Sequence, residues 1–124
     1  MIMKKKNEVL ELSFEFALQI IEYCELLEKN QKYVLAHQLL KSGTSIGANI
    51  REAQNAESIQ DFIHKLKIAA KEADETEYWL LLCEKSSSYP TTKQLSTSII
   101  SIKELLNSMI STIKNKNINN LKNQ

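Results

Sequence analysis

The 124-residue chain contains one proline, two glycines and two cysteines, and aromatic residues make up 6% of it. A chain with so little proline and glycine has too few turn residues for an all-β fold, so helices are favoured. Cys24 and Cys83 lie far apart, which excludes a Cys-x-x-Cys metal site. Each stands among apolar residues, and we expect two buried free thiols.

Long apolar runs are also missing from the chain. The longest wholly apolar run covers residues 78–83, far short of the ~20 residues that a membrane-spanning helix needs. The basic run Lys4 to Lys6 resembles the start of a signal peptide, but Glu8 and Glu11 follow where an apolar segment would have to be. We therefore predict a cytoplasmic protein without a membrane partner.

The basic residues are unevenly placed. Six of the 16 lysines and arginines lie in the two terminal segments, and the other 10 are set against 15 acidic residues, so residues 7–113 carry a net charge of −5. The overall charge thus does not indicate a nucleic-acid-binding protein, and any site for an anion has to be a local patch.

Four segments show apolar residues at steps of three and four, which is the period of an amphipathic helix. They cover residues 8–29, 32–55, 58–85 and 91–113. The links between them are short, and short links place consecutive helices antiparallel. The sequence therefore predicts an all-α fold, an antiparallel up-down-up-down four-helix bundle.

Local signals set the expected helix ends. We expect residues 1–7 to form a basic N-terminal tail, residues 8–113 the bundle, and residues 114–124 a disordered tail rich in asparagine and lysine. Capping residues are predicted at both ends of the first helix. Capping boxes, in which a serine or threonine is followed three residues later by an acid or an amide, are predicted at the starts of the third and fourth helices. These are Asn7 and Asn30, Ser58 with Asp61, and Thr91 with Gln94.

Both glycines lie inside the second predicted helix, at Gly43 and Gly47. Each should cost about 1 kcal/mol relative to alanine there, so a compensating contact is expected. Serine, threonine and alanine surround them, and such a low surface allows another backbone to pack closely. A helix break at residues 42–45 is the alternative.

A polar stripe follows the edge of the second helix, and the third helix carries a matching one. We interpret the stripes as a hydrogen-bonded network that fixes helix register or a subunit contact. The candidate network residues are Ser45, Asn49, Glu52, Glu75, Thr76 and Trp79. An acid and base pair of Glu52 and Glu75 is the catalytic alternative, but no nucleophile, metal-ligand set or phosphate-binding loop accompanies it.

A di-iron bundle would need Glu-x-x-His on two helices. Asp61 and His64 imitate this spacing once, and His37 has no acidic partner at the matching position. We expect no metal, no cofactor and no catalytic residue.

Positive charge is organised in one place. Lys41 and Arg51 share a line of the second helix, and His64, Lys67 and Lys71 recur at steps of three and four on the third. If the two lines adjoin, they form a candidate patch for the phosphates of RNA or DNA. Lysines paired with nearby acids on a solvated face are the alternative.

The stretches from Ser42 to Ala53 and from Ile68 to Leu80, with Asp61 and Phe62 between them, resemble a bacterial four-helix-bundle family. The family is named after proteins encoded in 23S rRNA intervening sequences, and the chain is also similar to the related accessory variability determinant of diversity-generating retroelements. The resemblance covers about residues 14–109. Its pattern Ser-x-x-Ser-Ile-x-x-Asn-Ile-x-Glu is specific in combination.

The resemblance implies a homopentamer of four-helix protomers without enzymatic activity, with a proposed affinity for nucleic acid or for a nucleic-acid enzyme such as a reverse transcriptase. The family's motif positions fall on the candidate network residues and on Phe62. The acidic body departs from the basic relatives thought to bind nucleic acid. Two functions therefore stay open: an oligomeric scaffold associated with nucleic acid, or a protein-binding adaptor or self-assembling structural protein with no nucleic-acid role.

Overall fold

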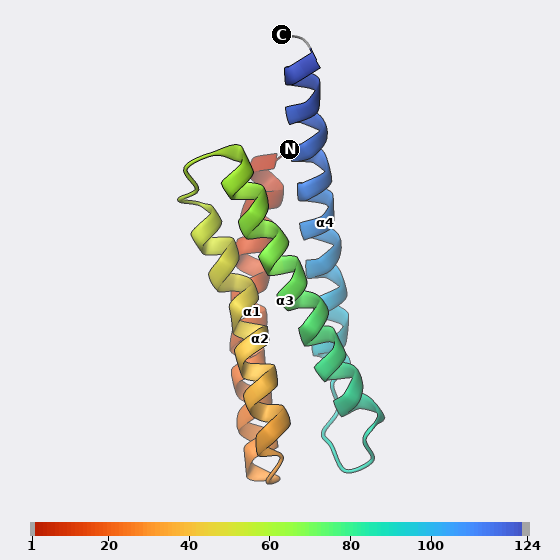
Figure 1. Ribbon diagram of the computed structural model, residues 1–124. Coiled ribbons are helices and arrows are strands. Elements are labelled where there is room, and N and C mark those ends of the chain that lie inside the picture. The colour runs from red at the N-terminus through yellow and green to blue at the C-terminus, as the bar shows by residue number, and fades with distance from the viewer. Residues whose placement is uncertain (1, 123–124) are drawn as a thin grey trace.

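Four helices form the bundle: α1 (Ile2–Lys29), α2 (Tyr33–Ala53), α3 (Ile59–Lys85) and α4 (Lys93–Lys122). The computed structural model describes residues 2–122, with side chains described from residue 4 onward. Consecutive helices run in opposite directions, and each packs against its two neighbours in the order α1, α2, α3, α4 (Figure 1). Within the described residues, neither diagonal pair brings two Cα atoms within 8 Å. The predicted all-α four-helix bundle is confirmed.

The first and last helices are longer than predicted. α1 begins at Ile2 and not after a cap at Asn7, and α4 continues past Ile113 to Lys122. The first turns of α1 are held in place, because Lys5 Nζ donates a 2.7 Å hydrogen bond to Ser108 Oγ of α4. At the other terminus, each residue added to an existing helix gains a backbone hydrogen bond, so α4 extends beyond the ends of the other helices (Figure 1). The two expected tails are therefore helical over residues 2–7 and 114–122.

The predicted caps are only partly correct. Ser58 Oγ accepts a hydrogen bond from the Asp61 amide at 3.0 Å, as predicted, but the Asp61 carboxylate accepts from the amide of Glu57. Thr91 Oγ1 accepts from the amide of Lys93, one residue before the predicted Gln94. The left-handed position at the end of α1 belongs to Gln31, with φ of 62°, and not to Asn30.

The core lies where the apolar lines of the four helices meet. α4 buries the predicted residues Leu95, Ile99, Ile102, Leu106 and Met109, while Ile113 is partly buried. None of the four helices, over the residues that the structure describes, combines the length and apolar character needed to cross a membrane.

Gly43 is required by the packing of α1 on α2. A Cβ added at Gly43 would lie 2.9 Å from both Cγ atoms of Ile20, which is closer than real Cβ atoms come. A Cβ at Gly47 would lie 3.4 Å from Ser13, an ordinary contact. The low surface predicted for another backbone is thus covered at Gly43 by α1 of the same chain, whereas Ala48 stays exposed. α2 is helical throughout, which excludes the break at residues 42–45.

Two thiols and a tyrosine lie buried toward the end of the bundle that holds the α3–α4 link. Tyr23 Oη donates a 2.8 Å hydrogen bond to the carbonyl of Pro90, which ties α1 to that link. Burial raises the pKa of the Cys24 thiol to about 12, and burial also raises the pKa of Cys83. The prediction of two buried free thiols is confirmed.

Candidate functional site

The predicted basic patch does not form on one surface. Lys41 of α2 lies beside Glu72 of α3. Burial raises the pKa of the Glu72 carboxyl, and the positive charge of Lys41 acts in the opposite direction. Arg51 lines a groove between α1 and α2 instead. Lys67 lies beside Lys114 of α4, and this like charge lowers the pKa of Lys67. His64 and Lys71 are exposed on α3.

The helical repeat explains why the patch divides. The ion pair between Lys65 and Glu52, 3.7 Å apart, marks the sides of α3 and α2 that face each other. Arg51 is one residue from Glu52, a rotation of roughly 100° around α2, and Lys67 is two residues from Lys65, roughly 200° around α3. The two predicted lines therefore point to different faces of the bundle.

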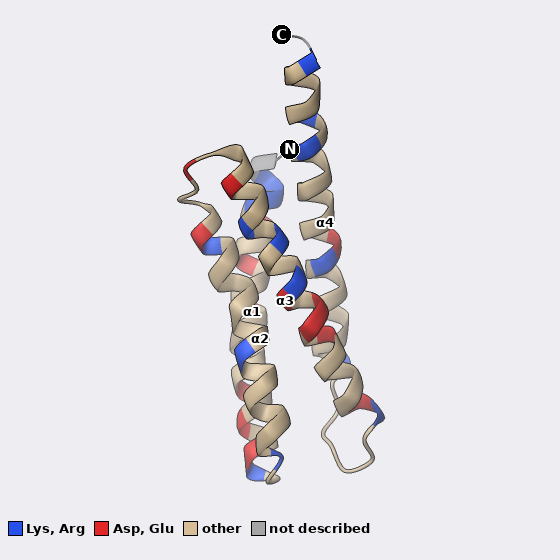
Figure 2. Cartoon of the chain, in the orientation of Figure 1, with Lys and Arg blue, Asp and Glu red and all other residues tan. Residues whose placement is uncertain are grey.

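Lysines instead gather at one end of the molecule. The up-down-up-down order brings the start of α1, the first half of α3 and the last turns of α4 to this end, and Figure 2 shows lysines, in blue, on all three. We call these residues the basic end. Its lysines are Lys4, Lys5, Lys6, Lys65, Lys67, Lys71, Lys114, Lys116 and Lys122.

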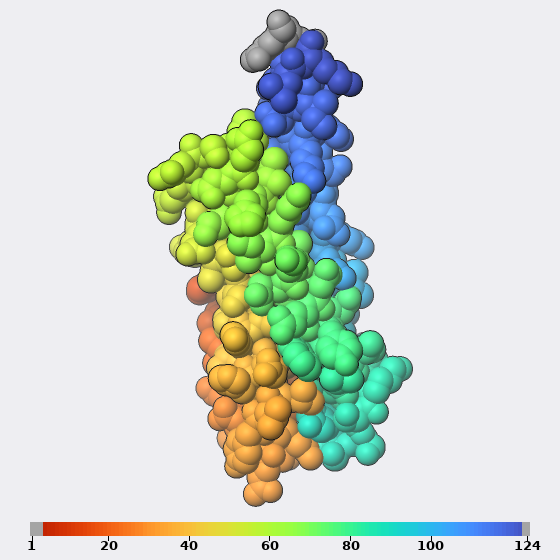
Figure 3. Space-filling view, viewed as in Figure 1, coloured from red at the N-terminus to blue at the C-terminus, as the bar shows by residue number. Residues whose placement is uncertain are grey.

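α2 and α3, which carry the polar stripes, pack against each other, and Figure 3 shows their atoms in contact along this seam. One hydrogen bond joins them in the core: the hydroxyls of Thr76 and Ser42 lie 2.9 Å apart, and both residues are buried. A hydroxyl has one proton, and Thr76 Oγ1 donates its proton to the Glu72 carbonyl at 2.7 Å. Ser42 is therefore the donor in the hydrogen bond between the two hydroxyls.

The other predicted network residues do not join this bond. Ser45 Oγ donates to the Lys41 carbonyl and Asn49 Nδ2 to the Ser45 carbonyl, both within α2. Glu52 and Glu75 are exposed. Trp79 is partly buried in the seam, and its Nε1 has no hydrogen-bond partner among the described residues. Of the predicted network residues, only Thr76 makes a side-chain hydrogen bond across the seam within one chain, and its partner is Ser42.

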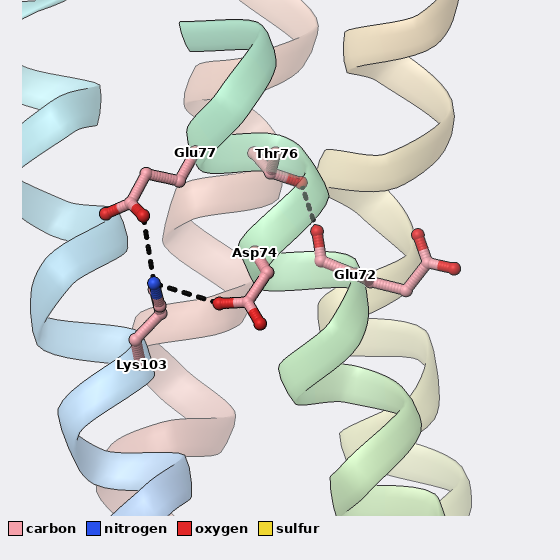
Figure 4. A network of polar contacts seen from close by, with 5 residues as sticks. All are labelled: Glu72, Asp74, Thr76, Glu77 and Lys103. Atoms are coloured by element: carbon pink, nitrogen blue, oxygen red, sulfur yellow. Dashed lines mark hydrogen bonds and ion pairs between the residues drawn. The ribbon is translucent and has the colours of Figure 1, made fainter. Parts of the chain in front are cut away.

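A polar cluster that sequence reasoning missed joins α3 to α4. Lys103 Nζ lies 2.9 Å from Asp74 Oδ1 and 2.9 Å from Glu77 Oε1 (Figure 4). Hydrogen bonds to these two carboxylates raise the pKa of Lys103. The signal was a pair of acids three residues apart on α3, but the sequence alone does not show which lysine lies opposite.

Apolar side chains remain exposed on the α1–α2 side. Phe14, Leu18 and Ile21 follow one another at steps of four and three on α1 and are 52%, 44% and 39% exposed. They adjoin the groove that contains Arg51, which has a cavity volume of about 170 Å³ and is otherwise lined mainly by small side chains. Leu40, 37% exposed, extends the surface on α2. We call this surface the α1–α2 face.

A second apolar surface lies on the α3–α4 side. Tyr78, Leu81 and Ile100 are 55%, 47% and 50% exposed and line a common cavity with Asp74 and Glu77. We call this surface the α3–α4 face. Since α1–α2 and α3–α4 are opposite sides of the four-helix square, the two apolar faces point away from each other.

The arrangement defines a class of protein: a four-helix bundle with a closed core, two apolar outer faces and a basic end. The chain belongs to the family of the 23S rRNA-intervening sequence protein, whose model matches residues 5–112. This confirms the resemblance seen in the sequence.

A solved structure agrees with this assignment. The chain is similar to a protein of unknown function from the S23 ribosomal protein family of Bacteroides thetaiotaomicron VPI-5482, with 48% identity and a TM-score of 0.81. The match covers 86% of this chain and 98% of that one. No curated protein matches the chain.

Proposed function

We propose that the chain is a non-enzymatic scaffold that assembles into a closed homo-oligomer, the pentamer that its family resemblance implies, and that associates with nucleic acid. The observation that carries the assembly is the exposure of large apolar side chains on two separate faces. Contiguous exposed apolar surface on a small protein marks an interaction site, because leaving it in water costs free energy.

The absence of an enzymatic role is supported by the placement of the two candidate catalytic carboxylates. Glu52 is 62% exposed in its side chain and pairs with Lys65, and Glu75 is exposed on another helix. A general acid or base works best in a cleft that excludes water, whereas both of these side chains are exposed.

Oligomeric state tests the assembly. Size-exclusion chromatography with light scattering, and native mass spectrometry, should give one closed species at micromolar concentration, with the mass of five chains. A monomer at that concentration would overturn the proposal. A different closed number would overturn only the pentamer.

The nucleic-acid association is supported by the basic end. A ring whose copies all point the same way would repeat these lysines around one rim, and phosphate contacts made there should release counterions. Affinity for duplex RNA and DNA should therefore fall steeply with salt and depend little on sequence.

We would measure binding at two salt concentrations for the wild type and for Lys4→Ala with Lys116→Ala. A matched control removes two exposed lysines from the opposite end: Lys29→Ala and Lys93→Ala. Only the first variant should lose affinity. Equal loss in both, or no binding by the wild type at low salt, would favour the protein-binding adaptor instead.

A further inference from the structure

The two apolar faces differ in shape, and this bears on how copies can meet. The α1–α2 face contains a groove lined by the small residues Ala17, Gly47 and Ala48. The α3–α4 face presents Tyr78 and Leu81. Two unlike surfaces on opposite sides of a subunit allow a head-to-tail contact, which can repeat around a ring, whereas a two-fold contact would use one surface twice.

The faces also match in level along the bundle. α1 and α3 start at the same end of the molecule (Figure 1), and Ile21 and Tyr78 each stand 19 residues after the first residue of their helix. At 1.5 Å per residue, both lie ~28 Å along the bundle. Two copies placed side by side and pointing the same way would therefore bring Ile21 of one copy level with Tyr78 of the next.

Charged residues flank both apolar centres, acids on α1 and lysines on α3, while the acids Asp74 and Glu77 of the α3–α4 face are paired with Lys103 of the same chain. On α1, Glu11 and Glu25 continue the line of Phe14, Leu18 and Ile21 at steps of three and four. On α3, two lysines flank Tyr78 and Leu81 on the same side of the helix: Lys67 toward the start of α3 and Lys85 at its end.

The upper pair is closely matched in level. Glu11 stands nine residues and Lys67 eight residues after the start of its helix. The like charge of Lys114 beside Lys67 is unfavourable within one chain, and a carboxylate from another copy would relieve it.

We propose that the α1–α2 face of one copy docks on the α3–α4 face of the next, with the copies parallel, so that Glu11 meets Lys67 across the contact. This rests on the proposed self-assembly and names the surfaces that carry it. The partner is a second copy of the chain, because Ile21 and Tyr78 of the two apolar centres lie at the same level, and Glu11 and Lys67 beside them carry opposite charges at nearly the same level.

Mixing of two monomeric variants tests the proposal. Leu18→Glu with Ile21→Glu places charges on the α1–α2 face and should block docking there. Leu81→Glu with Ile100→Glu does the same to the α3–α4 face. Each variant should be folded by circular dichroism and monomeric, and an equimolar mixture should give a dimer of one chain of each kind by native mass spectrometry, because each variant retains one intact face. The matched control, Ile118→Glu with Leu121→Glu on the projecting part of α4, should keep the wild-type mass.

A mixture that stays monomeric, or a face variant that keeps the wild-type mass, would overturn the proposed pairing while leaving self-assembly intact. A monomeric wild type would instead reject self-assembly itself.

A charge exchange gives a second test with substitutions at exposed positions. Glu11→Lys should weaken assembly roughly three- to tenfold, since like charges then meet across the contact. Adding Lys67→Glu to the same chain should restore it. The two residues lie on opposite sides of one chain, so the restoration reports a contact between copies, and its failure would overturn the Glu11–Lys67 pairing.

Discussion

Ser42 and Thr76 join α2 to α3 through a hydrogen bond between two buried hydroxyls 2.9 Å apart. In a second hydrogen bond, the Thr76 hydroxyl donates to the Glu72 carbonyl one turn earlier in α3. The pair therefore fixes the register of the two helices with polar groups in the buried part of the seam. Removing one partner leaves the other hydroxyl buried without a hydrogen bond, and this costs more free energy than the bond itself contributes.

We expect Thr76→Val to lower the free energy of unfolding by about 1 to 2 kcal/mol, because the shape of the side chain is kept while Ser42 loses its buried partner. Urea unfolding of the single variants and of Ser42→Ala with Thr76→Val gives the coupling energy. The double variant should be less destabilised than the sum of the singles, and strict additivity would show that the two hydroxyls do not interact.

The two glycines of α2 should respond differently to alanine. Gly43→Ala places a Cβ 2.9 Å from Ile20, and the overpacking should cost about 1 to 3 kcal/mol despite the better helix propensity of alanine. Gly47→Ala meets only an ordinary contact with Ser13 and should leave stability unchanged or raise it by up to about 1 kcal/mol. Thermal melting of the two variants side by side measures the difference, and an equal response would contradict the close approach of α1 at Gly43.

The fold could be predicted because its signals are local and repeated. Steps of three and four identify each helix, and short links leave antiparallel neighbours as the simple solution. The strict repeat is only approximate: a line of apolar residues at steps of three and four on α3 can start at Phe62, but the first buried residue of α3 is Ile63, because a helix of 3.6 residues per turn drifts relative to a strict repeat. The ends of α1 and α4 could not be predicted, since they depend on contacts such as Lys5 with Ser108.

The surfaces could be predicted only in part. Exposed residues on a helix show a periodicity but not which neighbour each line faces, and a rotation of roughly 200° separates Lys65, which faces α2, from Lys67, which faces α4. The sequence thus identified the cations, but it could not show whether their two lines adjoin. Ser42 stands on the predicted polar stripe of α2 but was not among the candidate network residues, although it is the partner of Thr76 across the seam. Helical periodicity does not show which member of such a stripe is buried.

Glu72 should make the stability of the bundle depend on pH. Partial burial, and then the neighbouring Glu75, raise the pKa of Glu72 above its ordinary value of 4.5. Because the folded state holds this proton more tightly than the unfolded state, the group favours folding at low pH, and that contribution is lost as pH rises from about 4.5 through the raised pKa.

Glu72→Gln should therefore raise the free energy of unfolding at pH 7, and with it the melting temperature. The gain should stay within about 0.5 kcal/mol because the side chain is only partly buried, and it should be smaller at pH 4. Melting of wild type and variant across this range measures it. A larger gain at pH 4 than at pH 7 would contradict the direction of the shift.

Cys24 and Cys83 should resist both alkylation and oxidation in the folded protein. Both thiols are buried, and with the pKa of Cys24 raised to about 12 almost none of it is the reactive thiolate at pH 8. A disulfide requires Cα atoms within about 7 Å, whereas α1 and α3 are diagonal helices whose described residues bring no Cα atoms within 8 Å. We expect reaction with a thiol reagent to be slow in buffer and fast in urea, at a rate that follows unfolding. Treatment with a mild oxidant should leave the chain without an internal disulfide by mass spectrometry. Rapid labelling without denaturant, or a Cys24–Cys83 bond formed without loss of helicity, would mean that the α1–α3 diagonal opens far more easily than the packing of this core allows.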